Sequence, residues 1–152
     1  MRRKDKKIDD IDTMNAIMSE AMVCRLAMVE GDRPYLVPLC FGYHNKTLFF
    51  HSALEGKKIE ILKKNPSVCF EIDKFVDLIT EEQPCKWSLR YQSVIGFGTA
   101  SIVESFDEKR KALMLIFAHY GGDASEFPAS KIRATSIIRV DIQELSGKAS
   151  GF

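Results

Sequence analysis

Apolar residues recur at spacings of three and four in three stretches of the chain, which predicts three helices. The first stretch covers residues 9–20, and the second, which is short and polar, covers residues 55–65 and stops before a proline. The third begins with a capping-box pattern at residues 105–108 and ends at the glycine pair 121–122. Each helix is expected to bury one face against a larger core.

Short runs of bulky apolar residues predict the strands, and turn residues separate them. These runs lie at residues 24–29, 35–43, 47–51, 68–72, 91–103 and 136–142. Residues 31–34 and 44–46 have the composition of tight turns, and residues 73–87 show no clear period, which predicts a long loop. Pro38 cannot donate a hydrogen bond within a sheet, so it indicates an edge, a bulge or exposed backbone.

The order of these elements predicts a mainly β protein. Short turns join the first three strands, which should therefore be antiparallel. About six strands with short helices between them favour an antiparallel barrel with helices at its edges. A doubly wound parallel sheet would need a helix after nearly every strand. No linker or repeat interrupts the chain, so we expect one domain over residues 1–152, with residues 1–8 as a flexible tail.

Composition places the chain among soluble globular proteins, because 45% of its residues are hydrophobic and 28% are charged. The 22 Lys and Arg residues nearly balance the 21 Asp and Glu residues, so we expect no nucleic-acid partner. The basic residues near the N-terminus are interpreted as a solvated tail. They are Arg2, Arg3, Lys4, Lys6 and Lys7.

The chain begins with charged residues and has no long apolar run, so we expect neither a secretory signal nor a membrane span. The four cysteines form no CxxC pair and have no histidine cluster beside them, which argues against zinc. They are expected to be buried, reduced thiols of a cytoplasmic protein. Asp9, Asp10 and Asp12 are interpreted as the acidic first turn of a helix rather than as metal ligands, so no metal site is expected.

The segment His51–Lys58 has the residues of a phosphate site. A strand ends at His51, and Ser52, Gly56, Lys57 and Lys58 lead into a helix. Backbone amides at a helix N-terminus, with a hydroxyl and ammonium groups nearby, suit a phosphate. The alternative is structural: Ser52 and Glu55 match a capping box, and the lysines could be solvated.

Three further candidate residues could have either a functional or a structural role. His51 could be a reactive group or a structural polar group within an apolar strand. Trp87 and Tyr91, which lead into the longest strand, could stack on a planar ligand or pack in the core.

Several segments form a wider pattern when they are taken together. They are Arg25–Ala27, Pro34–Leu39, Phe41–Tyr43, His51–Lys58, Asn65–Glu71, Tyr91–Ala100 and the pair His119-Tyr120. In this order and at these spacings the chain, from about Asp9 to Lys148, resembles the nitroimidazole-resistance group of the pyridoxamine 5′-phosphate oxidase-like flavoproteins. The resemblance implies a split β-barrel like that of the flavin reductases. It also implies a homodimer that binds flavin, usually FMN, at its interface; the pattern does not separate FMN from FAD.

The resemblance also assigns cofactor-binding roles. The strand residues along the isoalloxazine ring would be Val37, Pro38, Leu39 and Phe41. His51 and Ser52 stand where related oxidases have a Tyr-Thr pair beside the flavin. Lys57 and Lys58 stand where those oxidases have an Arg-Lys pair on the phosphate, and Gln92 or Ser93 would lie near the flavin from the long strand.

The implied function is a flavin-dependent oxidoreductase that reduces a small planar acceptor, for example a nitro-aromatic compound. His51 would donate a proton, and Trp87 or Tyr91 of either subunit would stack on the acceptor. One alternative is a flavin- or tetrapyrrole-binding module without turnover, and another is a purely structural dimer. The oxidases bind a substrate phosphate with basic residues that have no convincing counterpart in this chain, so we do not expect pyridoxamine phosphate oxidation.

Overall fold

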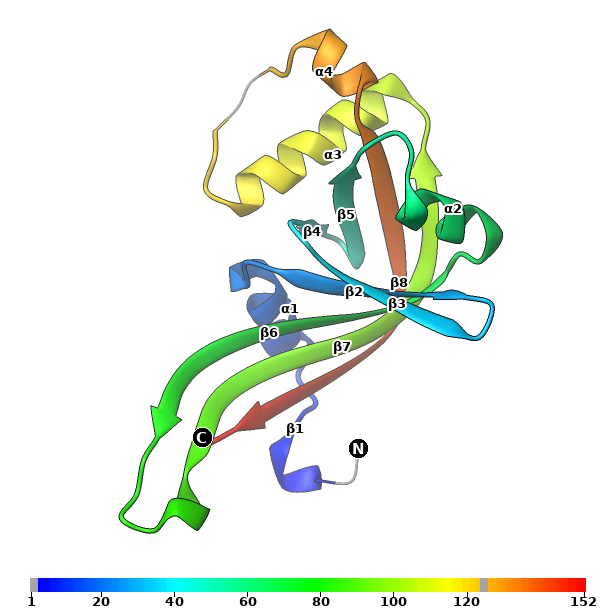
Figure 1. The fold of residues 1–152 in the computed structure, drawn as a ribbon. Coiled ribbons are helices and arrows are strands. Elements are labelled where there is room, and N and C mark those ends of the chain that lie inside the picture. The colour runs from blue at the N-terminus through cyan, green and yellow to red at the C-terminus, as the bar shows by residue number, and fades with distance from the viewer. Residues whose placement is uncertain (1–2, 124–125) are drawn as a thin grey trace.

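An antiparallel sheet of eight strands forms the body of the protein (Figure 1). This computed structural model describes residues 3–123 and 126–152. The strands are β1 (Lys7–Ile8), β2 (Cys24–Glu30), β3 (Arg33–Leu39), β4 (Gly42–His44), β5 (Thr47–Ser52), β6 (Ser67–Ile79), β7 (Ser88–Val103) and β8 (Ser136–Ser150). The helices are α1 (Ile11–Glu20), α2 (Lys57–Lys64), α3 (Phe106–His119) and α4 (Ala129–Arg133), with 3-10 turns η1 (Lys4–Lys6) and η2 (Pro84–Lys86).

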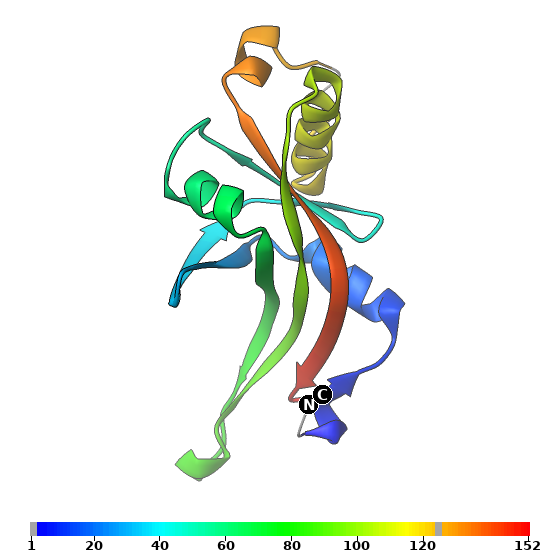
Figure 2. The ribbon, with the colours of Figure 1, turned by 90° about the vertical axis from the view of Figure 1, so that its right-hand side faces the viewer.

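The strands follow the order β3-β2-β6-β7-β8-β5-β4, and β1 also pairs with β8. Every neighbouring pair is antiparallel, which confirms the mainly β, antiparallel prediction. The prediction of about six strands missed β1 and the division of the second strand into β3 and β4. In the view of Figure 2, α2 and α3 lie on either side of β7.

The core lies between the sheet and its helices, in two clusters. The fully buried large side chains of the main cluster are Met18, Leu26, Met28, Phe41, Leu48, Phe50, Ile61, Phe70, Ile72 and Ile138. A second cluster joins α3 to the sheet through Val103, Ala112, Ile116 and Ile137. Apolar faces of α1, α2 and α3 supply residues to these clusters, as their periodicity predicts.

The predicted single strand over 35–43 is interrupted. β3 ends at Leu39, and β4 begins at Gly42 after a break at Cys40 and Phe41. The break follows from packing, because a Cβ on Gly42 would lie 2.8 Å from the backbone nitrogen of Ile116 in α3. Helix α3 thus presses directly on the start of β4. β3 is a terminal strand of the sheet, as Pro38 indicates.

The turns are tighter than predicted. Arg33 and Pro34 already belong to β3, so the first turn contains only Gly31 and Asp32. In the second turn, Asn45 and Lys46 have φ values of 46° and 59°. Positive φ at both central residues is the geometry that best joins two antiparallel strands.

The predicted long loop over 73–87 is wrong, because residues 73–79 belong to a strand and residues 84–86 to a 3-10 turn. β6 continues to Ile79 and pairs with β7 as far as Ser88, and η2 closes the hairpin. We call residues 73–91 the β6–β7 arm; Figure 1 shows it curving away from the body. Phe75, Val76 and Leu78 are exposed on it, so neither face of the arm is buried by the same chain. Without a buried face the sequence has no alternation to reveal the strands.

Both termini are more ordered than predicted. β8 runs to Ser150 rather than to residue 142, and Lys7 and Ile8 pair with Lys148 and Gly147 of β8. Residues 3–8, which were predicted as part of a flexible tail, therefore form a 3-10 turn and a strand. Met1 and Arg2, the start of that tail, lie outside the described residues. Helix α4 was not predicted, because five residues are too few for a periodic pattern.

No helix within the described ranges is long and apolar enough to span a membrane.

Candidate functional site

The N-terminus of α2 has no side-chain cap among the described residues. The helix begins after Gly56, whose φ is 125°. The capping-box alternative for Ser52 and Glu55 is therefore wrong, since neither side chain bonds the first turn. Gly56 has no Cβ, and a Cβ built there would meet no atom within 4 Å. The first-turn amides face an open surface, which is the arrangement that binds an anion.

The two lysines at this helix start differ in their surroundings. The ammonium of Lys57 lies 3.1 Å from a Glu30 carboxylate oxygen and 4.9 Å from the centroid of the Tyr35 ring. Lys58 is half-buried and makes no ion pair with any described residue. Lys57 and Glu30 are both half-exposed, so their ion pair is weak and easily exchanged for a ligand. The contacts of Lys57 bring the start of α2 against β3.

Strand β3 presents an open edge beside this helix start. Val37 and Leu39 are half-buried, whereas Pro38 is exposed. β3 pairs with β2 on one side and has no strand on the other in the described sheet. Val37 and Leu39 pack partly against the main core, and the outer backbone groups of β3 are free to meet the polar rim of a flat ligand.

A pocket of about 400 Å³ lies beside His51. Its lining residues are Cys40, His51, Leu113, Ile116, Phe117, Tyr120 and Phe127, and we call it the His51 pocket. Cys40 comes from the break after β3, His51 from β5, and most of the others from α3. The His51 side chain is exposed, so the alternative of a structural histidine buried in the strand is wrong. Phe41, in contrast, points inward and is fully buried.

The C-terminus of α3 holds the Cys40–Phe41 break in place. The Tyr120 hydroxyl accepts a hydrogen bond from the Phe41 amide at 3.1 Å and donates one to the Met22 carbonyl at 2.8 Å. His119 Nε2 lies 2.7 Å from the Ala21 carbonyl oxygen, and its ring centroid is 4.3 Å from that of Phe41. Because a carbonyl only accepts, Nε2 is the donor in that contact. These two residues tie three segments together.

Neither of these roles was predicted. His119 and Tyr120 were named in the sequence analysis as part of the family resemblance, without a structural role. No local periodicity connects Tyr120 to Phe41, 79 residues away. The prediction of buried thiols is correct only for Cys24: Cys69 is half-buried, Cys85 is exposed, and Cys40 is an exposed free cysteine at the pocket.

The remaining predicted residues lie on β7. Gln92 is half-buried and Ser93 is buried. Trp87 is 53% exposed, and its indole nitrogen donates to the Glu81 carbonyl, so the alternative of core packing is wrong for this side chain. Tyr91 is half-buried beneath the Lys148 ammonium, which lies 5.3 Å from its ring centroid.

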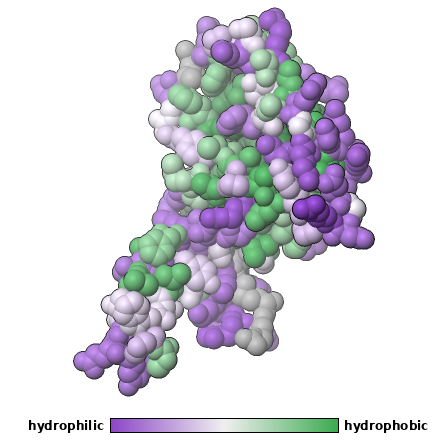
Figure 3. All heavy atoms as spheres, in the orientation of Figure 1, coloured by the Kyte–Doolittle hydropathy of each residue, from purple (hydrophilic) through white to green (hydrophobic). Residues whose placement is uncertain are grey.

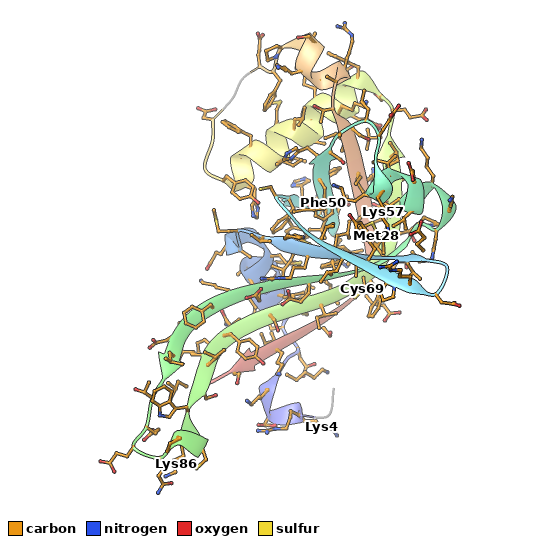
Figure 4. The ribbon with its side chains drawn as sticks, in the orientation of Figure 1. Lys4, Met28, Phe50, Lys57, Cys69 and Lys86 are labelled. Carbon is orange, nitrogen blue, oxygen red and sulfur yellow. The ribbon has the colours of Figure 1, made fainter. Side chains whose placement is uncertain are left out.

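One chain does not bring Trp87 to the His51 pocket. Figure 4 labels Lys57 at the start of α2 and Lys86, the neighbour of Trp87, at the far tip of the β6–β7 arm. Trp87 can therefore contribute to the pocket only if it comes from another copy of the chain.

The acidic residues at the start of α1 have a structural role. Asp12 lies in the first turn, as predicted, whereas the Asp10 carboxylate accepts a hydrogen bond from the Thr13 amide at 2.8 Å and caps the helix. Within residues 3–123 and 126–152, no cluster of three His, Cys, Asp or Glu side chains could hold a metal ion.

The Tyr120 hydroxyl forms a bridge through its hydrogen bonds to the Phe41 amide and the Met22 carbonyl. Removing this hydroxyl and measuring stability at several pH values tests the bridge. Burial raises the pKa of Tyr120 from 10.0 to about 12, so the folded state keeps a proton that the unfolded state loses. The stabilisation by the neutral hydroxyl is complete below pH 10 and is lost as the pH rises toward 12. We expect Tyr120→Phe to be less stable than the wild type at neutral pH by about 1–2 kcal/mol.

The difference between the two proteins should shrink as the pH rises above 10, and urea unfolding over that range measures it. A constant difference at all pH values would contradict the bridge.

Comparison with known proteins places the chain in a family. The sequence model described as pyridoxamine 5′-phosphate oxidase matches residues 10–149. A candidate 5-nitroimidazole antibiotic resistance protein of Bacteroides thetaiotaomicron is 33% identical over 94% of this chain and 86% of its own, with a TM-score of 0.84. An uncharacterised protein of Rhizobium meliloti is 30% identical over 59 residues, which are 38% of its length.

More distant structures share the fold. The flavocytochrome Anf3 of Azotobacter vinelandii is 17% identical over all of this chain and 72% of its own, with a TM-score of 0.85. The chain is also similar in fold to a FAD-binding protein of Mesorhizobium loti, with 20% identity, a TM-score of 0.72 and coverage of 96% and 98% of the two chains. The family match and these likenesses together confirm the split β-barrel: the chain belongs to the pyridoxamine 5′-phosphate oxidase family.

Proposed function

We propose that this protein binds FMN and uses it to reduce a small, planar, uncharged acceptor, for example a nitro-aromatic compound. The observation that carries the proposal is the convergence of three segments on one surface. Cys40, after β3, and His51, on β5, line the same pocket, and Lys57, at the start of α2, contacts Tyr35 of β3. The proposed phosphate site therefore lies near Tyr35 and the proposed ring site nearer Cys40, along the same strand.

The residues present fit a flavin. The uncapped first turn of α2, with Lys57 and Lys58, suits the phosphate, and Ser52 adds a hydroxyl. The open edge of β3 suits the ring. This arrangement addresses only the phosphate nearest to the ring, which FMN and FAD share, and FMN is proposed because the resemblance implies it. The 33% identical relative supports the proposal, as do fold relatives that are described as FAD-binding.

A bound flavin would supply the redox chemistry, with a reduced nicotinamide as the two-electron donor. The protein supplies orientation and protons. Reduction of a nitro group to a nitroso group consumes two electrons and two protons and releases water. His51 is exposed at the pocket and is the group placed to give one of these protons; the second comes from solvent.

We further propose that the working unit is a homodimer. The β6–β7 arm carries Phe75, Val76, Leu78, Trp87 and Leu89, which are each at least 43% exposed. Figure 3 shows hydrophobic side chains along this arm. Large apolar side chains exposed together on one segment mark an interface with another protein. A second copy seated on the arm would bring Trp87, Tyr91, Gln92 and Ser93 of one subunit toward the flavin site of the other. The four free thiols support a cytoplasmic location.

Light scattering tests the dimer. We expect the wild type to have twice the mass of one chain, and Leu89→Glu on the arm to yield monomers, because a carboxylate would be buried at the interface without a partner. Glu144→Gln, an exposed change on the neighbouring strand β8, should leave the mass unchanged. A wild-type protein that is monomeric at micromolar concentration would contradict the proposal.

An anaerobic turnover assay tests the activity. We expect the flavin-loaded protein to oxidise NADH or NADPH only when a nitro-aromatic compound is added, with one nicotinamide consumed for each nitroso group formed. Bound flavin with no turnover would instead favour the carrier or sensor. An exposed histidine beside an apolar pocket also suits a tetrapyrrole iron, so the absence of flavin together with haem uptake would favour the tetrapyrrole module.

A further inference from the structure

The His51 pocket is walled almost entirely by apolar side chains. Leu113, Ile116 and Phe117 come from α3, and Phe127 lies before α4. Only three of its described lining residues carry polar groups: the thiol of Cys40, the imidazole of His51 and the hydroxyl of Tyr120. A volume of about 400 Å³ is at the lower end of the range for small-molecule sites and fits a molecule of one or two rings.

Two aromatic rings line this pocket at a right angle. The centroids of Phe117 and Phe127 are 6.0 Å apart, with an interplanar angle of 87°. This edge-to-face arrangement is favourable and holds both rings in position. A flat ligand can then stack on one ring and meet the edge of the other.

The His51 pocket differs from the two neighbouring hollows because its described lining carries no fixed charge. No Lys, Arg, Asp or Glu is among its described lining residues. The hollow on the other side of α3 is lined by Lys111 and Asp123, and the hollow between α3 and α4 by Arg110 and Glu126. A carboxylate or phosphate that entered the His51 pocket would lose hydration without meeting a fixed cation. The lining therefore selects against anions.

We propose that the His51 pocket is the acceptor site, and that it takes an uncharged aromatic molecule of one or two rings. The ring lies against Phe117 and Phe127, and the reducible polar group points toward His51. This inference rests on the proposed oxidoreductase function, since it names the place and class of the acceptor. It assigns acceptor contacts to α3 of the same chain, in addition to any that Trp87 supplies from a second copy.

A pair of probes of matched size tests the site. Nitrobenzene and 4-nitrobenzoate share a ring and a nitro group but differ in charge. We expect the purified wild-type protein to bind nitrobenzene more tightly than 4-nitrobenzoate by on the order of tenfold or more, because only the anion must be desolvated without a partner. In NMR spectra, nitrobenzene should shift the ring signals of His51 and leave those of the exposed His44 unchanged.

Two substitutions at Phe117 test the charge argument in both directions. Phe117 is 42% exposed, so a polar side chain is tolerated there. Phe117→Asp should weaken nitrobenzene binding by about tenfold. Phe117→Lys should raise the affinity for 4-nitrobenzoate until it equals or exceeds that for nitrobenzene. Ala118→Asp and Ala118→Lys are the matched controls, because the adjacent residue lines the hollow on the other side of α3, and they should change neither affinity.

The outcomes separate this inference from the proposed function. If the Phe117 variants turn over nitrobenzene as fast as the wild type, the pocket assignment is wrong and the proposed oxidoreductase function stands. Binding that depends on Phe117, without any turnover, would keep the pocket and overturn the oxidoreductase. If the Phe117 variants fail to fold, equal affinity of the wild type for the two probes, or no shift of the His51 signals, overturns the pocket by itself.

Discussion

Lys57→Ala combined with Lys58→Ala is expected to weaken FMN binding by roughly a hundredfold, because hydrogen bonds to charged groups contribute about 1.5–3 kcal/mol each. Both lysines are at the start of α2, where no described side chain caps the first turn. The two changes should not contribute equally. Lys57 must leave Glu30 to reach a phosphate, whereas Lys58 leaves no ion pair, so Lys58→Ala should have the larger single effect.

The same helix offers a matched control for the charge. Lys63 and Lys64 lie in its last turn, so Lys63→Ala with Lys64→Ala removes the same two charges from the opposite end. This control should leave FMN affinity within about twofold, since exposed charges distant from a ligand are screened by salt. Circular dichroism checks that both double variants fold, and fluorescence titration with FMN measures affinity. Equal losses in the two double variants would show that only net charge matters and would remove the phosphate site.

His51→Gln is expected to lower turnover by about a hundredfold, the lower end of what a positioned general acid contributes. Glutamine keeps a polar side chain of similar length on β5 but cannot donate a proton as an acid. FMN should remain bound, because the phosphate contacts at α2 are untouched. Steady-state kinetics with NADH and nitrobenzene, with flavin content measured on the same sample, give the comparison.

His44→Gln is the control for this substitution. His44 is an exposed histidine at the end of β4, outside the lining of the His51 pocket, and its replacement should not change turnover. If His51→Gln retains full turnover while binding FMN, solvent supplies both protons and the role assigned to His51 is wrong. Loss of FMN in that variant would instead make His51 a cofactor-binding residue.

Much of the fold could be predicted because most strands bury one face. β2 alternates buried and half-buried residues from Cys24 to Met28, and the short apolar run of β5 is largely buried, so their patterns predicted strands. The β6–β7 arm has no such pattern, because backbone pairing alone maintains it within one chain. The second half of β8 is hidden from sequence reasoning for the same reason, since its residues alternate little between apolar and polar.

The site could be predicted in part. Local spacing indicated a phosphate site at His51–Lys58, and the structure removes the capping-box part of its alternative by leaving α2 uncapped. The His51 pocket could not be predicted, because its walls come from α3, more than sixty residues farther along the chain than His51. The bridge from Tyr120 to Phe41 is equally non-local. Spacing reports only neighbours along the chain, and these contacts depend on how α3 packs against β4.

The absorbance spectrum of the purified protein, with and without added FMN, tests the central claim most directly. We expect a yellow protein whose flavin bands bleach on reduction, and mass spectrometry of the released molecule should identify FMN at one per chain. A colourless protein whose spectrum and fluorescence show no binding of added FMN would contradict the account.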